Sequence, residues 1–251
     1  MIRSRAAATL VCLAAWSSSG CSSTGVGNPG VSSLSLSVVD DPKAQDEAQD
    51  LPDSAIQDAV VVLGELRFRA CDASVGHPHV VSGPFIVDLK RGTTTPEIPV
   101  IPGTPGGYCS LDAPLAPATS AALAGRSLFF DGTRADGTFF IVYANMTGTL
   151  KLRATDNQIW PGADTAHRFF WALRPRRWLL RAELDDADAT PDNDHQRAVV
   201  IDADRHTSLY LLIRSRLAGM STLYADADDN GVFTDSDRQA VVGQGLDDAD
   251  P

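Results

Sequence analysis

The sequence predicts a mainly β fold, a β-sandwich followed by a smaller α+β segment that contains a helix–loop–helix motif. Three observations predict it. Short apolar segments, several of them alternating with polar residues, recur with glycine and proline between them, as in sandwich strands. A helical apolar pattern is found only near the C-terminus, at 208–220. An acidic loop with a central glycine follows that pattern directly.

The first twenty residues have the pattern of a secretory signal. Arg3 and Arg5 precede an apolar stretch at 6–16, which is too short to span a membrane. The string Ser18-Ser19-Gly20-Cys21 then resembles the lipobox of bacterial lipoproteins, although serine stands at 18 where leucine is usual. The resemblance implies a signal peptide at 1–20 and a diacylated Cys21. It also implies a lipid anchor in the bacterial cell envelope, at the outer membrane or cell surface; a plain secretory signal is the alternative.

The remaining cysteines support an exported protein. Cys12 lies inside the predicted signal peptide, which leaves Cys71 and Cys109 as an even pair. In an oxidising compartment we expect these two to form a disulfide, worth roughly 3–4 kcal/mol in the chain-entropy model. Metal binding by the two thiolates is the weaker alternative, because neither belongs to a Cys-x-x-Cys pair.

After the lipobox, residues 21–33 form a predicted flexible tether and 34–160 a predicted β-sandwich domain. The tether is rich in Ser, Gly, Thr and Pro. Strands are expected at 34–38, within 59–70, and at 85–89, 98–101, 127–130, 138–143 and 149–154. The layout resembles the immunoglobulin-like or prealbumin-like sandwiches of bacterial surface lipoproteins. No residue motif carries that resemblance, so it implies no activity.

Charge is strongly segregated along the chain. The net charge is -11, from 21 basic and 32 acidic residues, which argues against a nucleic-acid partner. Residues 182–251 hold 16 acids and five arginines, so the whole excess lies in this segment. We therefore assign 161–251 to an acidic α+β region, either a cation-binding segment or a solvated acidic face.

The sequence DADDNGVFTDSD at 226–237 is the most specific motif. Its oxygen-bearing residues alternate, as calcium requires when six to eight oxygens converge from one tight loop. A glycine in the middle permits the sharp turn. The predicted calcium ligands are Asp226, Asp228, Asn230, the carbonyl of Val232, Thr234 and Asp237.

The pattern around this loop resembles an EF-hand or a dockerin calcium loop. Ser208 is the expected cap of an entering helix, 236–242 an expected exiting helix, and Phe233 an expected core contact. Asp237 replaces the longer glutamate usual at the twelfth position, so we expect weak calcium binding, on the order of 10⁻⁴ to 10⁻³ M. A preference for a smaller ion is one alternative, although dockerin-like loops also use aspartate there. An aspartate-rich turn that binds no ion is the other alternative.

Two further segments contain residues of a kind found in binding sites. The acidic run at 185–194 has Pro191 where a calcium loop needs glycine, and is at most an irregular second site. The sequence around Trp171 and Trp178 contains several arginines, including Arg174 and Arg176. We interpret these as a strand with tryptophans inward and arginines outward toward the acidic loop that follows; a sugar or polyanion site is the alternative.

The sequence contains no serine-hydrolase elbow, P-loop or zinc-protease motif, so we expect that the protein is not an enzyme. The predicted function is that of a monomeric, membrane-anchored envelope lipoprotein with a calcium-binding C-terminal region and a structural or binding role. Two alternatives are a secreted carbohydrate-active or hydrolytic enzyme and an adhesion or docking module with a protein or glycan partner.

Overall fold

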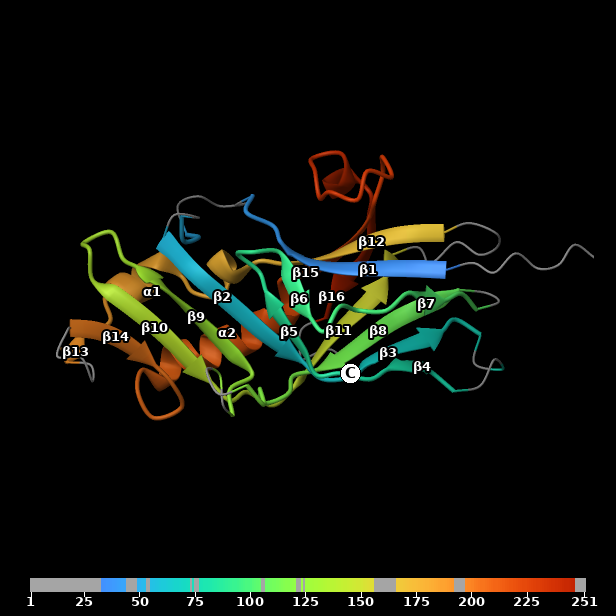
Figure 1. The fold of residues 1–251 in the computed structure, drawn as a ribbon. Helices are drawn as coiled ribbons and strands as arrows, with labels where there is room; N and C mark the ends of the chain where they lie inside the picture. Colours follow the sequence, from blue (N-terminus) through green and yellow to red (C-terminus); the bar gives the residue numbers. More distant parts are fainter. Residues whose placement is uncertain are drawn as a thin grey trace, which may run out of the picture.

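The computed structural model describes residues 33–43, 49–52, 55–72, 74, 77–104, 107–120, 123, 125–155, 166–191 and 197–246. The signal peptide, Cys21 and nearly all of the tether lie outside these residues. The described chain is mainly β, as predicted, with its strands in two sheets (Figure 1). No helix in the described part is long and apolar enough to cross a bilayer.

The larger sheet has nine strands, and most neighbours in it are antiparallel. The exception is the long parallel pair β1–β12, which runs from Ser33 opposite Ala166 to Asp40 opposite Leu173. In spatial order the strands are β4 (His79–Val81), β3 (Leu66–Ala70), β8 (Tyr108–Pro114), β11 (Thr149–Ala154), β16 (Val241–Gly245), β15 (Ser221–Ala225), β12 (Ala166–Leu173), β1 (Ser33–Asp40) and β7 (Ile101–Pro102).

The smaller sheet has seven strands. The hairpin predicted around 127–143 is confirmed as β9 and β10, which pair antiparallel. In spatial order the strands are β13 (Thr190–Pro191), β14 (Arg197–Ile201), β10 (Phe139–Ala144), β9 (Leu128–Thr133), β2 (Ile56–Leu63), β5 (Phe85–Asp88) and β6 (Thr93–Thr95).

Both sheets combine strands from the two predicted regions. β12, β15 and β16 from the C-terminal region complete the larger sheet, and β13 and β14 extend the smaller one. The boundary predicted at residue 160 therefore does not separate the sheets. One hydrophobic cluster contains buried side chains of both, among them Phe130 of β9 and Trp171 of β12.

The two tryptophans of the arginine-rich segment belong to this core. Trp171 and Trp178 are both 0% exposed, and the ring of Trp178 meets Phe130 edge-on at 5.7 Å between centroids. The prediction of inward tryptophans is confirmed. The prediction of outward arginines is wrong for Arg174 and Arg176, which are also buried. Burial of both indole rings leaves no exposed tryptophan face here on which a sugar ring would stack.

The helix predicted near the C-terminus is α2 (Thr207–Gly219), and its residues Leu209, Ile213 and Leu217 are buried. Its N-cap is His206, in the left-handed conformation, and not the predicted Ser208. A shorter helix, α1 (Arg181–Asp185), precedes β13. The smaller α+β part thus consists of helices whose neighbouring strands belong to the two shared sheets.

The predicted helix–loop–helix is not what surrounds the acidic loop. Strand β15 separates α2 from the loop, and after the loop a 3₁₀ turn, η6 (Asp237–Gln239), leads into strand β16. The reason is tertiary: β15 finds hydrogen-bonding partners on both sides, in β12 and β16. Its sequence, Ser-Thr-Leu-Tyr-Ala, also includes residues that favour strands.

The predicted disulfide between Cys71 and Cys109 is present, with 4.8 Å between the Cα atoms. It joins the residue just after β3 to the second residue of β8, the neighbouring strand. The bond therefore closes a loop of 38 residues onto a strand pair that is already hydrogen-bonded.

Replacing both cysteines, Cys71→Ala with Cys109→Ala, is expected to lower the free energy of unfolding. The chain-entropy model gives about 4 kcal/mol for the 38-residue loop. Guanidinium denaturation of the oxidised protein and of the double variant measures the difference. Wild-type protein treated with a reductant is the control and should lose a similar amount; a loss below about 1 kcal/mol in both would contradict the assigned role.

Candidate metal centre

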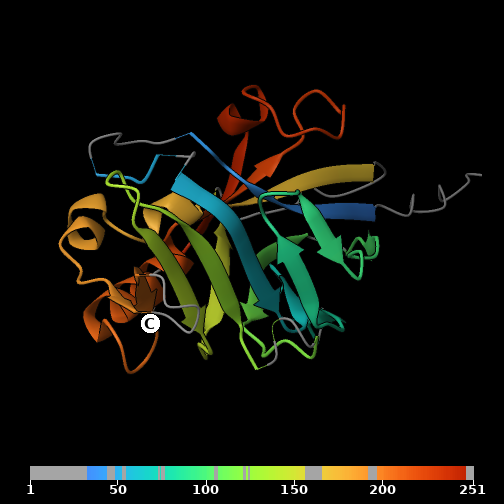
Figure 2. The same cartoon turned by 60° about the vertical axis from the view of Figure 1, so that its left-hand side comes forward.

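The acidic loop connects two neighbouring antiparallel strands, β15 and β16 (Figures 1 and 2). It packs on the face of the larger sheet that points away from the main hydrophobic cluster, which we call the outer face. The side chain of Phe233 packs the loop against this face. Its ring lies 5.5 Å from that of Phe170 and 5.4 Å from that of Tyr224. The apolar residue of the motif therefore packs as predicted, although it contacts an outer cluster and not the main core.

Three of the predicted ligands converge. One carboxylate oxygen each from Asp226, Asp228 and Asp237 lies within 4.8 Å of the other two. Asp226 and Asp237 are buried, and Asp228 is exposed. Such spacing suits oxygens around a common cation. The cluster thus has two buried carboxylates and one that is exposed to solvent.

Asp226 carries the least satisfied oxygen of the cluster. Its Oδ2 accepts hydrogen bonds from the Gly231 N–H at 2.9 Å and from Arg168 Nη1 at 3.1 Å. Its Oδ1 is buried and has no hydrogen-bond partner in the described structure. A buried carboxylate oxygen without a partner is costly. A cation held among the three carboxylates would supply what Oδ1 lacks.

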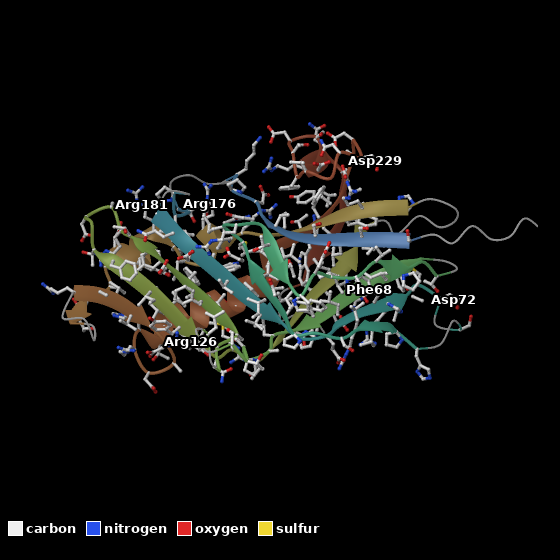
Figure 3. The ribbon with its side chains drawn as sticks, in the orientation of Figure 1. Phe68, Asp72, Arg126, Arg176, Arg181 and Asp229 are labelled. Carbon is white, nitrogen blue, oxygen red and sulfur yellow. A yellow bond between two sulfur atoms is a disulfide. The ribbon has the colours of Figure 1, made fainter. Side chains whose placement is uncertain are left out.

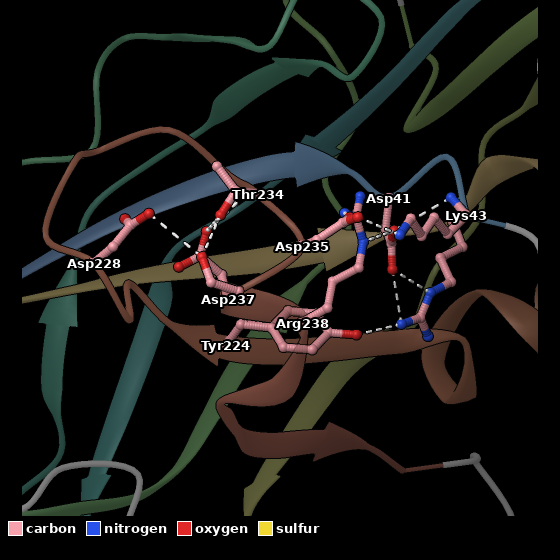
Figure 4. A network of polar contacts seen from close by, with 10 residues as sticks. Asp41, Lys43, Tyr224, Asp228, Thr234, Asp235, Asp237 and Arg238 are labelled. Atoms are coloured by element: carbon pink, nitrogen blue, oxygen red, sulfur yellow. Dashed lines mark hydrogen bonds and ion pairs between the residues drawn. The ribbon is translucent and has the colours of Figure 1, made fainter.

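Asp237 is held by loop donors (Figure 4). Its Oδ1 accepts from the Ala227 N–H at 2.8 Å, and its Oδ2 accepts from the Thr234 N–H at 2.6 Å and the Thr234 hydroxyl at 2.9 Å. Burial raises the pKa of Asp237, but these hydrogen bonds and the charge of Arg238 together hold the pKa below its ordinary value. The residue at the twelfth position is therefore preorganised as a carboxylate.

Local turns set the backbone of the loop. Asp228 Oδ1 accepts from the Asn230 N–H at 3.3 Å, and Asn230 Oδ1 accepts from the Val232 N–H at 2.6 Å. Gly231 has φ of 76°, in the left-handed region. A Cβ there would also lie 2.3 Å from Arg168 Nη1. The backbone conformation thus favours glycine, and a side chain there would also displace the flexible Arg168 guanidinium.

The other three predicted ligands are not part of the carboxylate cluster. The side-chain oxygen of Asn230 is directed to the Val232 amide. The Thr234 hydroxyl contacts Asp237 and, at 2.7 Å, the Ser236 hydroxyl. The Val232 side chain is 63% exposed. These residues shape the loop in the structure as described, so their role as ligands stays a prediction.

A buried ion-pair network beside the loop was missed by sequence reasoning. Asp41 is 2% exposed and accepts from Arg174 Nε at 3.0 Å and from Arg238 Nε at 2.8 Å (Figure 4). Arg174 also donates to the Tyr224 hydroxyl at 2.5 Å. The sequence predicts that Arg174 faces outward toward the acidic segment after it, and that prediction is wrong: its partner is Asp41. No local pattern indicates a contact between residues 197 positions apart.

The same network reaches the loop surface through a second pair. Lys43 Nζ lies 2.6 Å from Asp235 Oδ2, and Arg238 also bonds Asp235. Hydrogen bonding to Lys43, aided by the charges of Lys43 and Arg238, lowers the pKa of Asp235. The segment that follows β1 therefore contacts the acidic loop through Lys43 and Asp235.

The second acidic run at 185–194 yields no comparable cluster. Asp185 ends α1, while Asp192 and Asp194 lie outside the described residues. Within the described ranges, Asp226, Asp228 and Asp237 form the one group of three acidic, histidine or cysteine side chains close enough to share an ion.

The sequence matches no known protein-family model, and no curated protein or solved structure is significantly similar to it.

Asp237→Asn is expected to lower the free energy of unfolding at pH 7 by about 2 kcal/mol without added metal, because the amide cannot accept all of the loop's donated hydrogen bonds. The lowered pKa of Asp237 means that its stabilisation is present above about pH 4, the unfolded value, and is lost as pH falls through the folded value. The difference between variant and wild type should therefore narrow below about pH 4.

Urea denaturation across pH measures this difference. Asp229→Asn is the matched control, since it removes the same charge from the exposed tip of the same loop (Figure 3). A wild-type advantage over Asp237→Asn that is equal at pH 7 and at about pH 3 would contradict the assignment.

Proposed function

We propose that this protein is a bacterial cell-envelope lipoprotein whose C-terminal loop binds calcium and thereby orders the region around it, in a structural or binding role. The observation that carries the calcium proposal is the convergence of Asp226, Asp228 and Asp237, one carboxylate oxygen of each lying within 4.8 Å of the other two. The buried Asp226 Oδ1, which has no hydrogen-bond partner in the described structure, supports it. The donor set is all oxygen, which suits a hard cation such as Ca²⁺.

Calcium is favoured over a smaller ion by the supply of ligands. The loop offers three carboxylates, with further oxygens on Asn230 and Thr234 close in sequence, and calcium accepts six to eight oxygens in flexible geometry. Mg²⁺ demands near-ideal octahedral geometry and retains water. Arg168 pairs with Asp226 and the charge of Arg238 acts on Asp237, while Asp228 has no ion pair among the described residues. The three carboxylates therefore keep a net negative charge, which favours a divalent ion.

The effect of the ion would extend beyond the loop. Phe233 binds the loop to the outer face of β12 and β15, and Arg238 binds it to Asp41 at the end of β1. An ion that fixes the loop would stabilise the central strands of the larger sheet. We also propose that the two sheets pack as a β-sandwich; the shared hydrophobic cluster supports this.

The anchoring part of the proposal comes from the N-terminal sequence. The lipobox-like string ends at Cys21, twelve residues before β1 begins at Ser33. The disulfide is consistent with an oxidising compartment outside the cytosol. The carbohydrate-active alternative loses its main support, because Trp171 and Trp178 are buried.

Calcium at about 10 mM should raise the melting temperature by about 3–10 °C, because binding with Kd of 10⁻⁴ to 10⁻³ M adds about 1–3 kcal/mol to the folded state. Asp228→Asn should abolish most of this increase. Differential scanning calorimetry with calcium or with a chelator measures the shift, and isothermal titration measures the affinity.

The matched control is Asp229→Asn, which removes the same charge one residue away from a position outside the carboxylate cluster. It should retain the calcium response. An equal shift in both variants would mean that calcium acts on general surface charge, and no shift in the wild type would refute the site.

Cys21→Ser is expected to release the protein from the membrane fraction, because the serine hydroxyl does not receive the thioether-linked lipid. Fractionation after a wash in about 0.5 M NaCl, which screens surface electrostatics, measures the distribution. Cys12→Ser is the control and should remain membrane-bound. Retention of Cys21→Ser in the washed membranes at the size of the chain without residues 1–20 would contradict lipid anchoring; an uncleaved signal peptide is recognised by its larger size on a gel.

A further inference from the structure

The outer face of the larger sheet carries a cluster of cations on strands β3 and β11, which lie on either side of β8. Strand register places Arg67 and Lys151 on either side of Asp112, and Arg69 and Arg153 on either side of Ser110. All four cationic residues are exposed. We call Arg67, Arg69, Lys151 and Arg153 the basic face.

Half of the basic face is uncompensated. Arg67 pairs with Glu65, and Arg69 Nε lies 2.8 Å from Asp112 Oδ2. Neither Lys151 nor Arg153 has an ion-pair partner in the described part of the chain. These two lie two residues apart on one strand, so both project from the same side of the sheet.

A groove of about 290 Å³ lies within the basic face. Its lining includes Arg69, Lys151, Arg153, the Ser110 hydroxyl and one carboxylate, Asp112. Guanidinium, ammonium and hydroxyl donors converging on one groove match the oxygens of a phosphate group. Lys151 and Arg153 lie two residues apart on one strand, and their like charges repel each other unless an anion compensates them.

We propose that the basic face binds the phosphate headgroups of an anionic bilayer. The sheet topology selects this partner. β1, β12, β16 and β8 all run in the same direction, because each step from β12 through β15, β16 and β11 to β8 is antiparallel. The start of β8, with Ser110, therefore lies at the same end of the sheet as the start of β1.

Arg69 and Arg153 lie at that end as well, because β3 and β11 run opposite to β8 and both residues are near their C-terminal ends. The chain between Cys21 and Ser33 spans at most about 40 Å when extended. A bilayer holding a lipid on Cys21 is thus within reach of the basic face. The choice of a bilayer as the partner rests on the proposed anchor at Cys21. The arrangement of the cations in the basic face does not depend on that anchor.

The test measures binding of residues 21–251 carrying Cys21→Ser, so that neither the predicted signal peptide nor a covalent lipid contributes. The probes are vesicles of phosphatidylcholine alone or with about 30% phosphatidylglycerol, in low salt with a chelator that excludes calcium bridging. The chain is kept to Pro251 because Asp247, Asp248 and Asp250 follow Leu246, a groove residue, and their charge must be included. We expect clear preference for the anionic vesicles, lost in high salt.

Lys151→Gln with Arg153→Gln should weaken binding to the anionic vesicles about tenfold or more. Arg181→Gln with Arg214→Gln removes the same charge from two exposed helical positions and should leave binding within about twofold. Circular dichroism and an intact disulfide verify that each variant is folded.

Equal weakening by both variants would overturn the proposal, because net charge alone would then explain the binding. Binding of soluble hexametaphosphate without preference for anionic vesicles would also overturn it, in favour of a soluble polyanion site. The chelator makes either result independent of calcium binding, and membrane release of Cys21→Ser in cells tests the anchor separately.

Discussion

The arrangement of the candidate site depends on one buried ion-pair network, in which Asp41 bridges Arg174 and Arg238. Arg174 follows β12, Asp41 follows β1, and Arg238 lies in the turn before β16, so three separate chain segments meet at one carboxylate. Removal of one partner from such a pair typically costs about 3–5 kcal/mol because an uncompensated charge stays buried. Arg238 is adjacent to Asp237, so the network fixes where the last carboxylate of the loop stands.

This constraint explains why the three carboxylates converge although the loop lacks helices on either side. In a helix–loop–helix, two helices fix the ends of the loop. Here the first end is fixed by β15, with the Asp226 N–H donating to the Arg168 carbonyl at 2.9 Å. The second end is fixed by Arg238 and by the pairing of β16. The spacing of oxygens along the loop is therefore sufficient for convergence when neighbouring strands hold its ends.

Sequence reasoning succeeded where the pattern was local. Alternation or a short apolar run identified β1, β2, β3, β5, β9, β10 and β11. The cysteine count identified the disulfide, and the spacing of Asp226, Asp228 and Asp237 identified carboxylates that lie together. It failed for β15, whose five residues show no alternation because four in succession are buried. It also failed for Asp41, whose partner is 197 residues away, and for the basic face, which exists only once the register of three strands is known.

Net charge illustrates the same difference between chain and surface. The value of -11 argues against nucleic acid as a partner, yet the outer face of the larger sheet presents an acidic loop over β12 and β15 and a cationic groove across β3, β8 and β11. The two lie on one face, because Arg69, Ser110, Arg153, Gln244 and Thr222 form one continuous cross-strand row. Surface potentials decay over about 8–10 Å at physiological salt. The interaction of a partner with this sheet is therefore determined by the local charge of the strands that it contacts, and not by the net charge of the chain. For this reason a chain with an excess of acidic residues is able to present cations to an anionic surface.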